Sequence, residues 1–153
     1  MGCTQRIYAF FSDTTVCNAG WYGYSDVCYK FFLTAIEHRE AAQHCLSKNG
    51  FLVTATVDSM TFLNQMHTVS AYKSLHKWWS GFIDQFGNKK YLTSTGTRLR
   101  NNDAGLFETS AVFGHLVHIS WGEDDNGTFM TGQNGELEFP YICQTSNGKL
   151  AYT

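Results

Sequence analysis

Hydrophobic residues in the first half of the chain fall into short runs that predict strands. Residues 26–33 are an aromatic-rich run typical of a strand, and residues 8–11 form an earlier apolar run that predicts another. Residues 51–57 predict a third strand. Helical patterns follow the second and third of these runs, so strands and helices alternate in this half.

Two helices are predicted from the spacing of apolar side chains. The first spans residues 38–46 and is ended by Asn49-Gly50, a pair that commonly stops a helix. Its apolar positions, three and four residues apart, are Ala42, Cys45 and Leu46. The second begins at Asp58, which is a suitable N-cap. Its buried stripe is predicted to be Phe62, Leu63 and Met66.

The second half of the chain has a different pattern. Gly, Asn, Asp and Thr occur densely over residues 87–135, and the apolar runs are short. Strands are predicted over residues 78–83, 114–121 and 139–143. Two helices followed by short strands and a long looped region favour an α+β fold. A long loop in a compact domain is usually functional or disordered, and this chain is 43% hydrophobic and only 16% charged, which argues against disorder.

Size, charge and motifs exclude several classes of protein. The 153 residues suffice for one domain. The net charge is −2 without any basic run, so the electrostatic signature of a nucleic-acid binder is missing. No segment approaches the ~20 apolar residues of a membrane-spanning helix. No nucleophile-elbow, zinc-protease or phosphate-loop motif is present, so we expect no catalytic residues and no enzyme.

Five cysteines suggest two disulfides and one odd thiol. They are Cys3, Cys17, Cys28, Cys45 and Cys143. Their wide spacing fits neither a redox motif nor a zinc site, and four cysteines allow three pairings. Disulfides imply an oxidising compartment, and the sequon at Asn126 agrees with secretion as a glycoprotein. The odd Cys3 lies near the N-terminus, where it offers a link between two chains.

Several motifs, in this order, resemble the C-type lectin-like domain in its long form. They are Cys17-Asn-Ala-Gly-Trp21 with Cys28-Tyr29, Ala41-Ala-Gln-His-Cys45, Gly50-Phe-Leu-Val53, Trp78-Trp-Ser-Gly-Phe-Ile83 and Pro140-Tyr-Ile-Cys143-Gln144. The resemblance implies two helices, small antiparallel sheets and a long loop, braced by disulfides. It places the domain at residues 17–146, after an extension or first strand at 1–16 and before a tail at 147–153.

The resemblance also implies how the cysteines pair. Cys17 would bond to Cys28, and Cys45 to Cys143. The family's further disulfide across the long loop has no cysteines here, because His115 and Asn134 stand near those places. Secretion, or the extracellular part of a membrane protein, is the compartment that this family implies.

Calcium-dependent sugar binding in this family needs oxygen ligands that are altered here. The only proline is Pro140, so the loop triplet that contains a proline is missing. Residues 125–131 correspond to the second ligand motif, but Met130 and Thr131 replace its oxygen ligands, and a thioether is a poor ligand for calcium. We therefore expect no cofactor. A displaced calcium site on residues 101–108 or 123–126 stays open, although Asn and Asp are also common in plain turns.

The segment of residues 100–131 is predicted to carry recognition of a protein or glycan. The candidate ligand-binding residues are Asn101, Asn102, Asp103, Glu108, Trp121, Asp124, Asp125 and Phe129. The acidic run at residues 123–125 favours a basic partner, and Trp121 and Phe129 are candidates for an exposed aromatic patch, with burial in the core as the alternative. Trp78 and Trp79 are explained at least in part by the core motif. His115 and His118 would lie on a strand facing opposite ways, which disfavours a shared metal.

Overall fold

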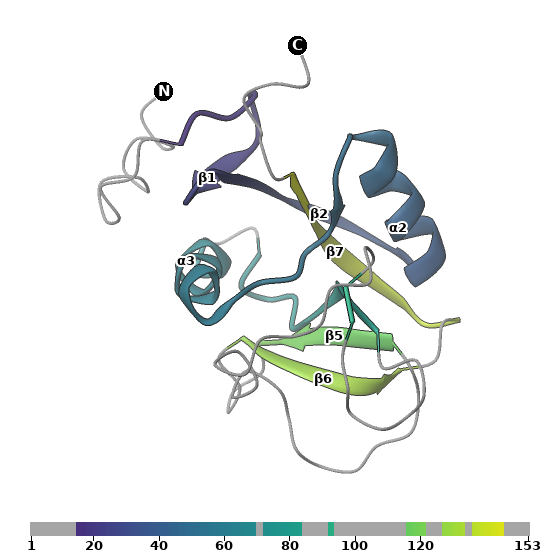
Figure 1. The fold of residues 1–153 in the computed structure, drawn as a ribbon. Helices are drawn as coiled ribbons and strands as arrows, with labels where there is room; N and C mark the ends of the chain where they lie inside the picture. Colours follow the sequence, from purple (N-terminus) through teal and green to yellow (C-terminus); the bar gives the residue numbers. More distant parts are fainter. Residues whose placement is uncertain are drawn as a thin grey trace.

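The computed structural model describes residues 15–69, 72–83, 92–93, 116–121, 127–133 and 136–145. Two helices and seven strands occur among these residues (Figure 1). In chain order they are β1 (Tyr22–Tyr24), β2 (Val27–Glu37), α2 (His38–Ser47), β3 (Phe51–Leu52), α3 (Val57–His67), β4 (Lys77–Ile83), β5 (Leu116–Ser120), β6 (Thr128–Gln133) and β7 (Glu138–Thr145). The predicted α+β class with two helices is confirmed. No helix in the described part is long and apolar enough to cross a membrane.

The strands join into a single sheet with the order β1-β2-β7-β4-β5-β6, and β3 pairs with β7. All pairs are antiparallel except β4 with β7, which meet in parallel at Trp79 and Tyr141. The small sheets expected from the sequence are therefore connected through this one contact. The long β2–β7 pair lies at the centre, with α2 and α3 on opposite sides of it (Figure 1).

Helix α2 begins and ends where the sequence predicts. The Glu40 carboxylate accepts a hydrogen bond from the Glu37 backbone N–H at 3.4 Å, and Asn49 has a left-handed backbone with φ 63°. The buried positions are Ala41 and Cys45, whereas Leu46 is 57% exposed. Leu46, one of the three apolar positions that identified this helix, therefore lies outside its covered face, which includes Ala41 and Cys45.

Helix α3 begins two residues earlier than expected. Its N-cap is Thr56, whose hydroxyl accepts from the Ser59 N–H at 3.2 Å, while the Ser59 hydroxyl accepts from the Thr56 N–H at 2.8 Å. Asp58 lies inside the first turn, where a negative charge is favoured by the helix dipole. The prediction of Asp58 as N-cap is wrong, whereas the buried stripe is confirmed: Phe62, Leu63 and Met66.

Strand boundaries differ from the prediction mainly around β3. Residues 51–57 were expected to form one strand, but β3 ends at Leu52 and α3 starts at Val57. Strand β2 is longer than expected, and β6 was not expected. Strand β5 begins at Leu116, and the predicted run at residues 8–11 lies outside the described part of the chain.

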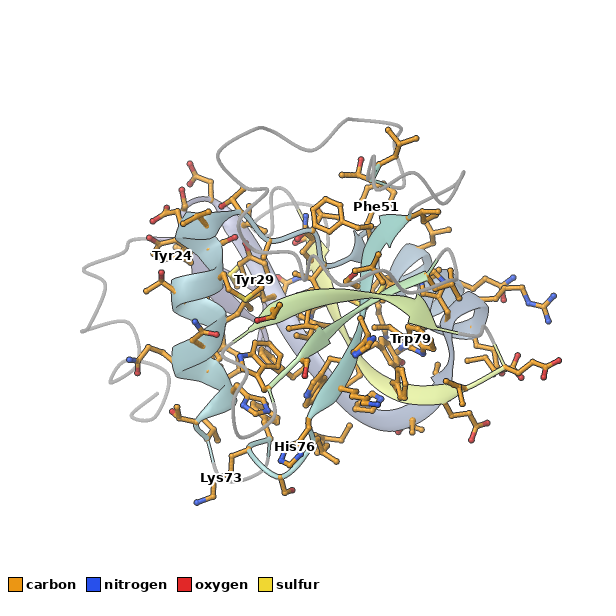
Figure 2. The ribbon with its side chains drawn as sticks, turned by 90° about the horizontal axis from the view of Figure 1, so that it is seen from below. Tyr24, Tyr29, Phe51, Lys73, His76 and Trp79 are labelled. Atoms are coloured by element: carbon orange, nitrogen blue, oxygen red, sulfur yellow. A yellow bond between two sulfur atoms is a disulfide. The ribbon has the colours of Figure 1, made fainter. Side chains whose placement is uncertain are left out.

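The adjacent tryptophans of β4 fill two separate cores. Trp78 lies in the cluster on the α3 side and Trp79 in the cluster on the α2 side, and both have no exposed surface. Each indole N–H donates to a backbone carbonyl at 2.8 Å, Trp78 to Leu75 and Trp79 to Ile36. In Figure 2, Tyr29 lies beside helix α3, whereas Trp79 lies away from this helix. Both tryptophans are therefore core residues and are not available to stack on a sugar.

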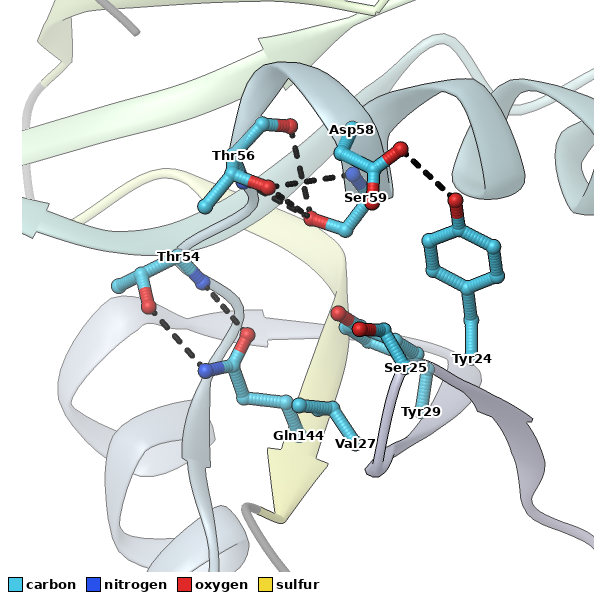
Figure 3. A pocket seen from close by; sticks show the side chains of 9 residues that line it. All are labelled: Tyr24, Ser25, Val27, Tyr29, Thr54, Thr56, Asp58, Ser59 and Gln144. Carbon is cyan, nitrogen blue, oxygen red and sulfur yellow. Dashed lines mark hydrogen bonds between the residues drawn. The ribbon is translucent and has the colours of Figure 1, made fainter. Parts of the chain in front are cut away.

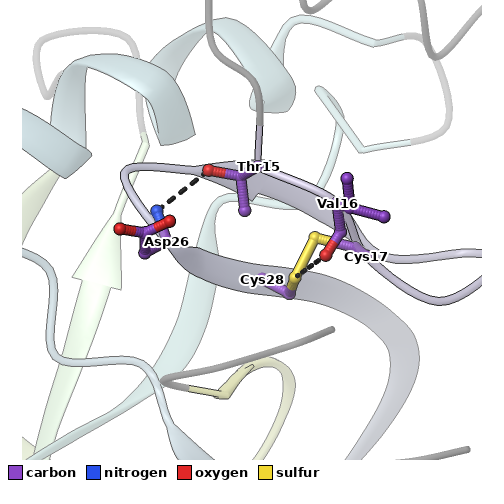
Figure 4. Close-up of a disulfide and its surroundings, with 5 residues drawn as sticks. All are labelled: Thr15, Val16, Cys17, Asp26 and Cys28. Atoms are coloured by element: carbon purple, nitrogen blue, oxygen red, sulfur yellow. Dashed lines mark hydrogen bonds between the residues drawn. A yellow bond between two sulfur atoms is a disulfide. The ribbon is translucent and has the colours of Figure 1, made fainter. Parts of the chain in front are cut away.

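Two disulfides connect the cysteines as the resemblance implied. Cys17 bonds to Cys28 across 11 residues and Cys45 bonds to Cys143 across 98. The first closes the N-terminal hairpin (Figure 4), and the second ties α2 to β7. Thr15 adds to the hairpin by accepting from the Asp26 N–H at 2.9 Å. Cys3 lies outside the described residues.

Candidate functional site

Most of the predicted recognition segment, residues 100–131, lies outside the described part of the chain. The predicted residues found there are Asn101, Asn102, Asp103, Glu108, Asp124, Asp125 and the sequon residue Asn126. Phe129 has a described backbone in β6, where it pairs with Ile119 of β5. The structure therefore describes the residues that hold this segment in the fold, which we call its frame: Ile83, Leu92, Leu116, Ser120, Trp121 and Gly127. The ligand-binding residues of the segment stay predictions.

The first part of the frame is where the chain leaves β4. Ile83 and Leu92 exchange two backbone hydrogen bonds, 2.8 Å from the Ile83 N–H and 2.9 Å from the Leu92 N–H. Ile83 is also the register partner of Leu116, the first residue of β5. The departure at Ile83 and the return at Leu116 are thus neighbours in the sheet. The residues on either side of the stretch 94–115 are therefore held next to Ile83 of β4.

The second part of the frame is the turn from β5 to β6. Ser120 pairs with Thr128, and the Gly127 N–H donates to the Ser120 carbonyl at 3.2 Å. Gly127 has φ 74°, and a Cβ there would lie 2.4 Å from Asn64 Oδ1 of α3. Only glycine fits this close approach without strain. The short stretch 122–126 therefore leaves and returns at adjacent positions held against α3.

Trp121 belongs to this frame and not to an exposed patch. It is only 6% exposed, and its ring stacks on His67 at 4.4 Å with an interplanar angle of 12°. Its indole N–H donates to Asn64 Oδ1 at 2.7 Å, and its backbone N–H donates to the His76 carbonyl at 2.7 Å. Of the two interpretations that the sequence left open for Trp121, an exposed aromatic patch or the core, the structure supports the core. The sequence contained a signal for this burial: apolar residues alternate along β5 at Val117 and Ile119, and the same alternation continues to position 121.

Two histidines, His38 and His67, are part of the packing. His67 is buried, and its Nε2 lies 2.7 Å from the Leu75 carbonyl. His38 is half-buried beside Trp79, with Nε2 3.2 Å from the Ser80 carbonyl. Burial lowers the pKa of each ring, against an opposing effect of the backbone carbonyl. Both rings are therefore held in their neutral form.

Acidification is expected to destabilise the protein. Because the folded-state pKa values of His38 and His67 lie below their ordinary 6.5, the unfolded chain takes up protons first as pH falls. The two neutral rings contribute their full stabilisation of the folded state above about pH 6.5. This contribution declines as the pH falls below about 6.5 and through the folded-state pKa values. The thermal midpoint should therefore be lower at about pH 5 than at about pH 7.5.

A set of single variants isolates the histidine contribution. His67→Gln should reduce the difference between the two midpoints, because a neutral amide takes up no proton. His76→Gln is the comparison variant: His76 is exposed, and its charge is the smallest of the three effects on the pKa of His67, so its loss should change the difference less than His67→Gln does. A midpoint difference that is unchanged in His67→Gln would contradict the assignment.

The described part of the chain holds no group of three or more His, Cys, Asp or Glu side chains able to bind a metal. Met130, which stands where the calcium-binding pattern has an oxygen ligand, pairs with His118 in the β5–β6 ladder. His118 is itself buried on β5, which fits the expected strand. The acidic residues expected for a displaced calcium site lie outside the described residues.

The chain matches no protein-family model and no curated protein sequence. Solved structures do match: the mouse scavenger receptor C-type lectin carbohydrate-recognition domain has a TM-score of 0.70 and 14% identity over 88% of this chain and 100% of that one. Human lithostathine has a TM-score of 0.69 and 20% identity, covering 86% and 92%. The Ca²⁺-independent C-type lectin SPL-2 from Saxidomus purpuratus has a TM-score of 0.68 and 18% identity, covering 85% and 94%.

Proposed function

We propose that this chain, which has the C-type lectin-like fold, is an extracellular recognition module that binds a protein or glycan through residues 100–131. The observation that carries the proposal is the frame of that segment. The stretch 94–115, which contains the first part of the segment, leaves and re-enters the sheet next to the paired residues Ile83 and Leu116. Trp121, at the start of the β5–β6 turn, donates a hydrogen bond to Asn64 of α3. Loops displayed on a rigid scaffold commonly carry binding residues.

Several observations support an extracellular setting. Two disulfides brace the domain, and such bonds persist in oxidising compartments. The sequon at Asn126 lies within the proposed recognition segment. We also propose that residues 17–146 form the domain, since the described elements run from Tyr22 to Thr145.

The chemistry of the segment supports recognition without the usual calcium site. Met130 and Thr131 stand where oxygen ligands are needed, and calcium takes oxygen ligands almost exclusively. SPL-2, which has a similar fold, is described as Ca²⁺-independent. Another similar structure is a complex of SPL-1 with GlcNAc. The amide and aromatic side chains of Asn101, Asn102 and Phe129, with an acidic cluster at Asp124 and Asp125, would then contact the ligand.

A second candidate is a calcium-dependent lectin with a displaced site. The observation in its favour is the concentration of oxygen ligands at Asn101, Asn102, Asp103 and Glu108. A bound calcium ion would supply coordination positions for sugar hydroxyls. This candidate differs from the first in one property, the response to a chelator.

Binding to a glycan array with calcium and then with a chelator separates the two candidates. We expect the same glycans, or none in the case of a protein ligand, under both conditions. The melting temperature of the unaltered chain should be the same with calcium and with the chelator, and the variant Asp103→Asn with Glu108→Gln should keep the binding of the unaltered chain. Binding that is lost with the chelator and in this variant would support the displaced calcium site instead.

A further inference from the structure

A pocket of about 330 Å³ is lined by described residues from the first part of the chain and from β7. Nine residues from the β1–β2 hairpin, the β3–α3 connection, the start of α3 and the end of β7 line it (Figure 3). None of them belongs to residues 100–131. All nine lie in the described part of the chain.

One wall of the pocket is formed by Tyr24 and Asp58. The Tyr24 hydroxyl donates to Asp58 Oδ1 at 2.8 Å. The Tyr24 ring is stacked on Phe62 of α3 at 5.2 Å with an angle of 11°. The hairpin and the helix are thus joined by both a ring contact and a hydrogen bond. The carboxylate is held at the rim in a fixed direction (Figure 3).

The opposite wall contains the side-chain amide of Gln144, whose oxygen and nitrogen are both hydrogen-bonded to Thr54. Gln144 Oε1 accepts from the Thr54 N–H at 2.9 Å, and Gln144 Nε2 donates to Thr54 Oγ1 at 3.1 Å. Tyr29 lies between the two walls and is only 3% exposed. Its phenol oxygen is hydrogen-bonded to the Ser59 side chain. Burial raises the pKa of Tyr29 to about 12, so the phenol stays protonated and can act as a donor.

The lining selects for one class of ligand. Six of the nine residues carry hydroxyl groups, one carries an amide, one a carboxylate, and no Lys, Arg or His is among them. Hydroxyls and amides both donate and accept, as do the hydroxyls of a polyol. An anion would meet the Asp58 carboxylate without any compensating cation. An amine meets no such repulsion, but the helix dipole of α3 already stabilises the charge of Asp58, so a cation gains little over a neutral hydroxyl at this carboxylate.

The size of the pocket sets the size of the ligand. Pockets for small molecules usually measure about 300–1,000 Å³, so this one is at the small end. We propose that it binds one neutral, hydroxyl-rich ring of monosaccharide size, with Asp58, Gln144 and Tyr29 as the fixed polar contacts. This site is additional to the proposed recognition segment and does not depend on it.

The test is an NMR titration of the full ¹⁵N-labelled chain with sugars that differ only in charge or in one hydroxyl. The neutral probes are D-glucose, D-galactose and D-mannose, and the charged probes are D-glucuronate and D-glucosamine. At least one neutral sugar should shift the amide signals of residues 24–29, 54–59 and 144 at millimolar concentration, and glucuronate should not. No shift at these residues with any neutral sugar, or tighter binding of glucosamine than of glucose, overturns the proposal.

Variants then connect the shifts to the pocket. Asp58→Asn and Tyr24→Phe keep the shape of the side chains and should each weaken binding about tenfold, because hydrogen bonds to a fixed charged group are lost. Asp26→Asn is the matched control, because it removes the same charge as Asp58→Asn but from the β1–β2 hairpin, at a residue that does not line the pocket. Asparagine tolerates the φ of 65° at this position. Equal weakening in Asp26→Asn and Asp58→Asn overturns the proposal. Glycan-array binding through residues 100–131 should be the same in all three variants.

Discussion

The variant Cys45→Ala with Cys143→Ala is expected to lower the free energy of unfolding by about 4–5 kcal/mol, measured by urea denaturation followed by tryptophan fluorescence. The bridge closes a stretch of 98 residues, and in the chain-entropy model the restriction of the unfolded chain grows with that length. Both cysteines are fully buried, and alanine leaves no unpaired polar group there. A domain has only about 5–15 kcal/mol in total, so this loss approaches unfolding.

The second disulfide provides the matched control for this prediction. Cys17→Ala with Cys28→Ala opens a stretch of only 11 residues and should cost about 3 kcal/mol on the same model. The larger loss must follow the longer bridge. An equal or smaller loss on opening Cys45–Cys143 would contradict the interpretation that this bond, which ties α2 to β7, is the stronger brace of the domain.

Helix positions could be predicted from the sequence, but the buried side of a helix could not be predicted in full. The spacing of Ala42, Cys45 and Leu46 identified α2 and its end at Asn49. Which of these is covered depends on β7 and Trp79, which come from distant parts of the chain. As a result Ala41 is buried, and Leu46 is 57% exposed.

The error at the start of α3 has a tertiary cause. Residues 51–57 have strand character, but after Val53 the Thr54 N–H bonds to the side chain of Gln144 and no longer to a strand. The chain thereby leaves the sheet early, and Thr56 becomes the N-cap instead of Asp58. A contact between residues 90 positions apart cannot be predicted from local propensity.

The disulfides and the candidate sites also divide into features that the sequence could predict and features that depend on distant contacts. The cysteine spacing alone left three pairings open, and the order of the lectin-like motifs correctly implied the observed one. The pocket lined by Tyr24, Asp58 and Gln144 had no sequence signal, since its residues come from four separate segments. The sequence left the exposure of Trp121 open because of its position beside a loop, whereas Asn64 and His67 of α3 cover it.

Trp78→Ala and Trp79→Ala are each expected to cost about 3–5 kcal/mol of unfolding free energy, measured by urea denaturation. Neither indole has any exposed surface, and each lies in a different core cluster. Truncation removes the ring contacts, leaves a cavity, and frees the carbonyl of Leu75 or Ile36 from its donor. The two losses should be similar, because β4 contributes one tryptophan to each side of the sheet.

Trp21→Ala is the control that separates burial from the mere presence of an indole. Trp21 is half-buried and meets Phe32 edge-on at 6.5 Å, so its loss should cost only about 1 kcal/mol. The result that would reverse this interpretation is a Trp79→Ala protein that keeps its stability but no longer binds its ligand. That outcome would make Trp79 a contact residue, which its complete burial and its bond to the Ile36 carbonyl argue against.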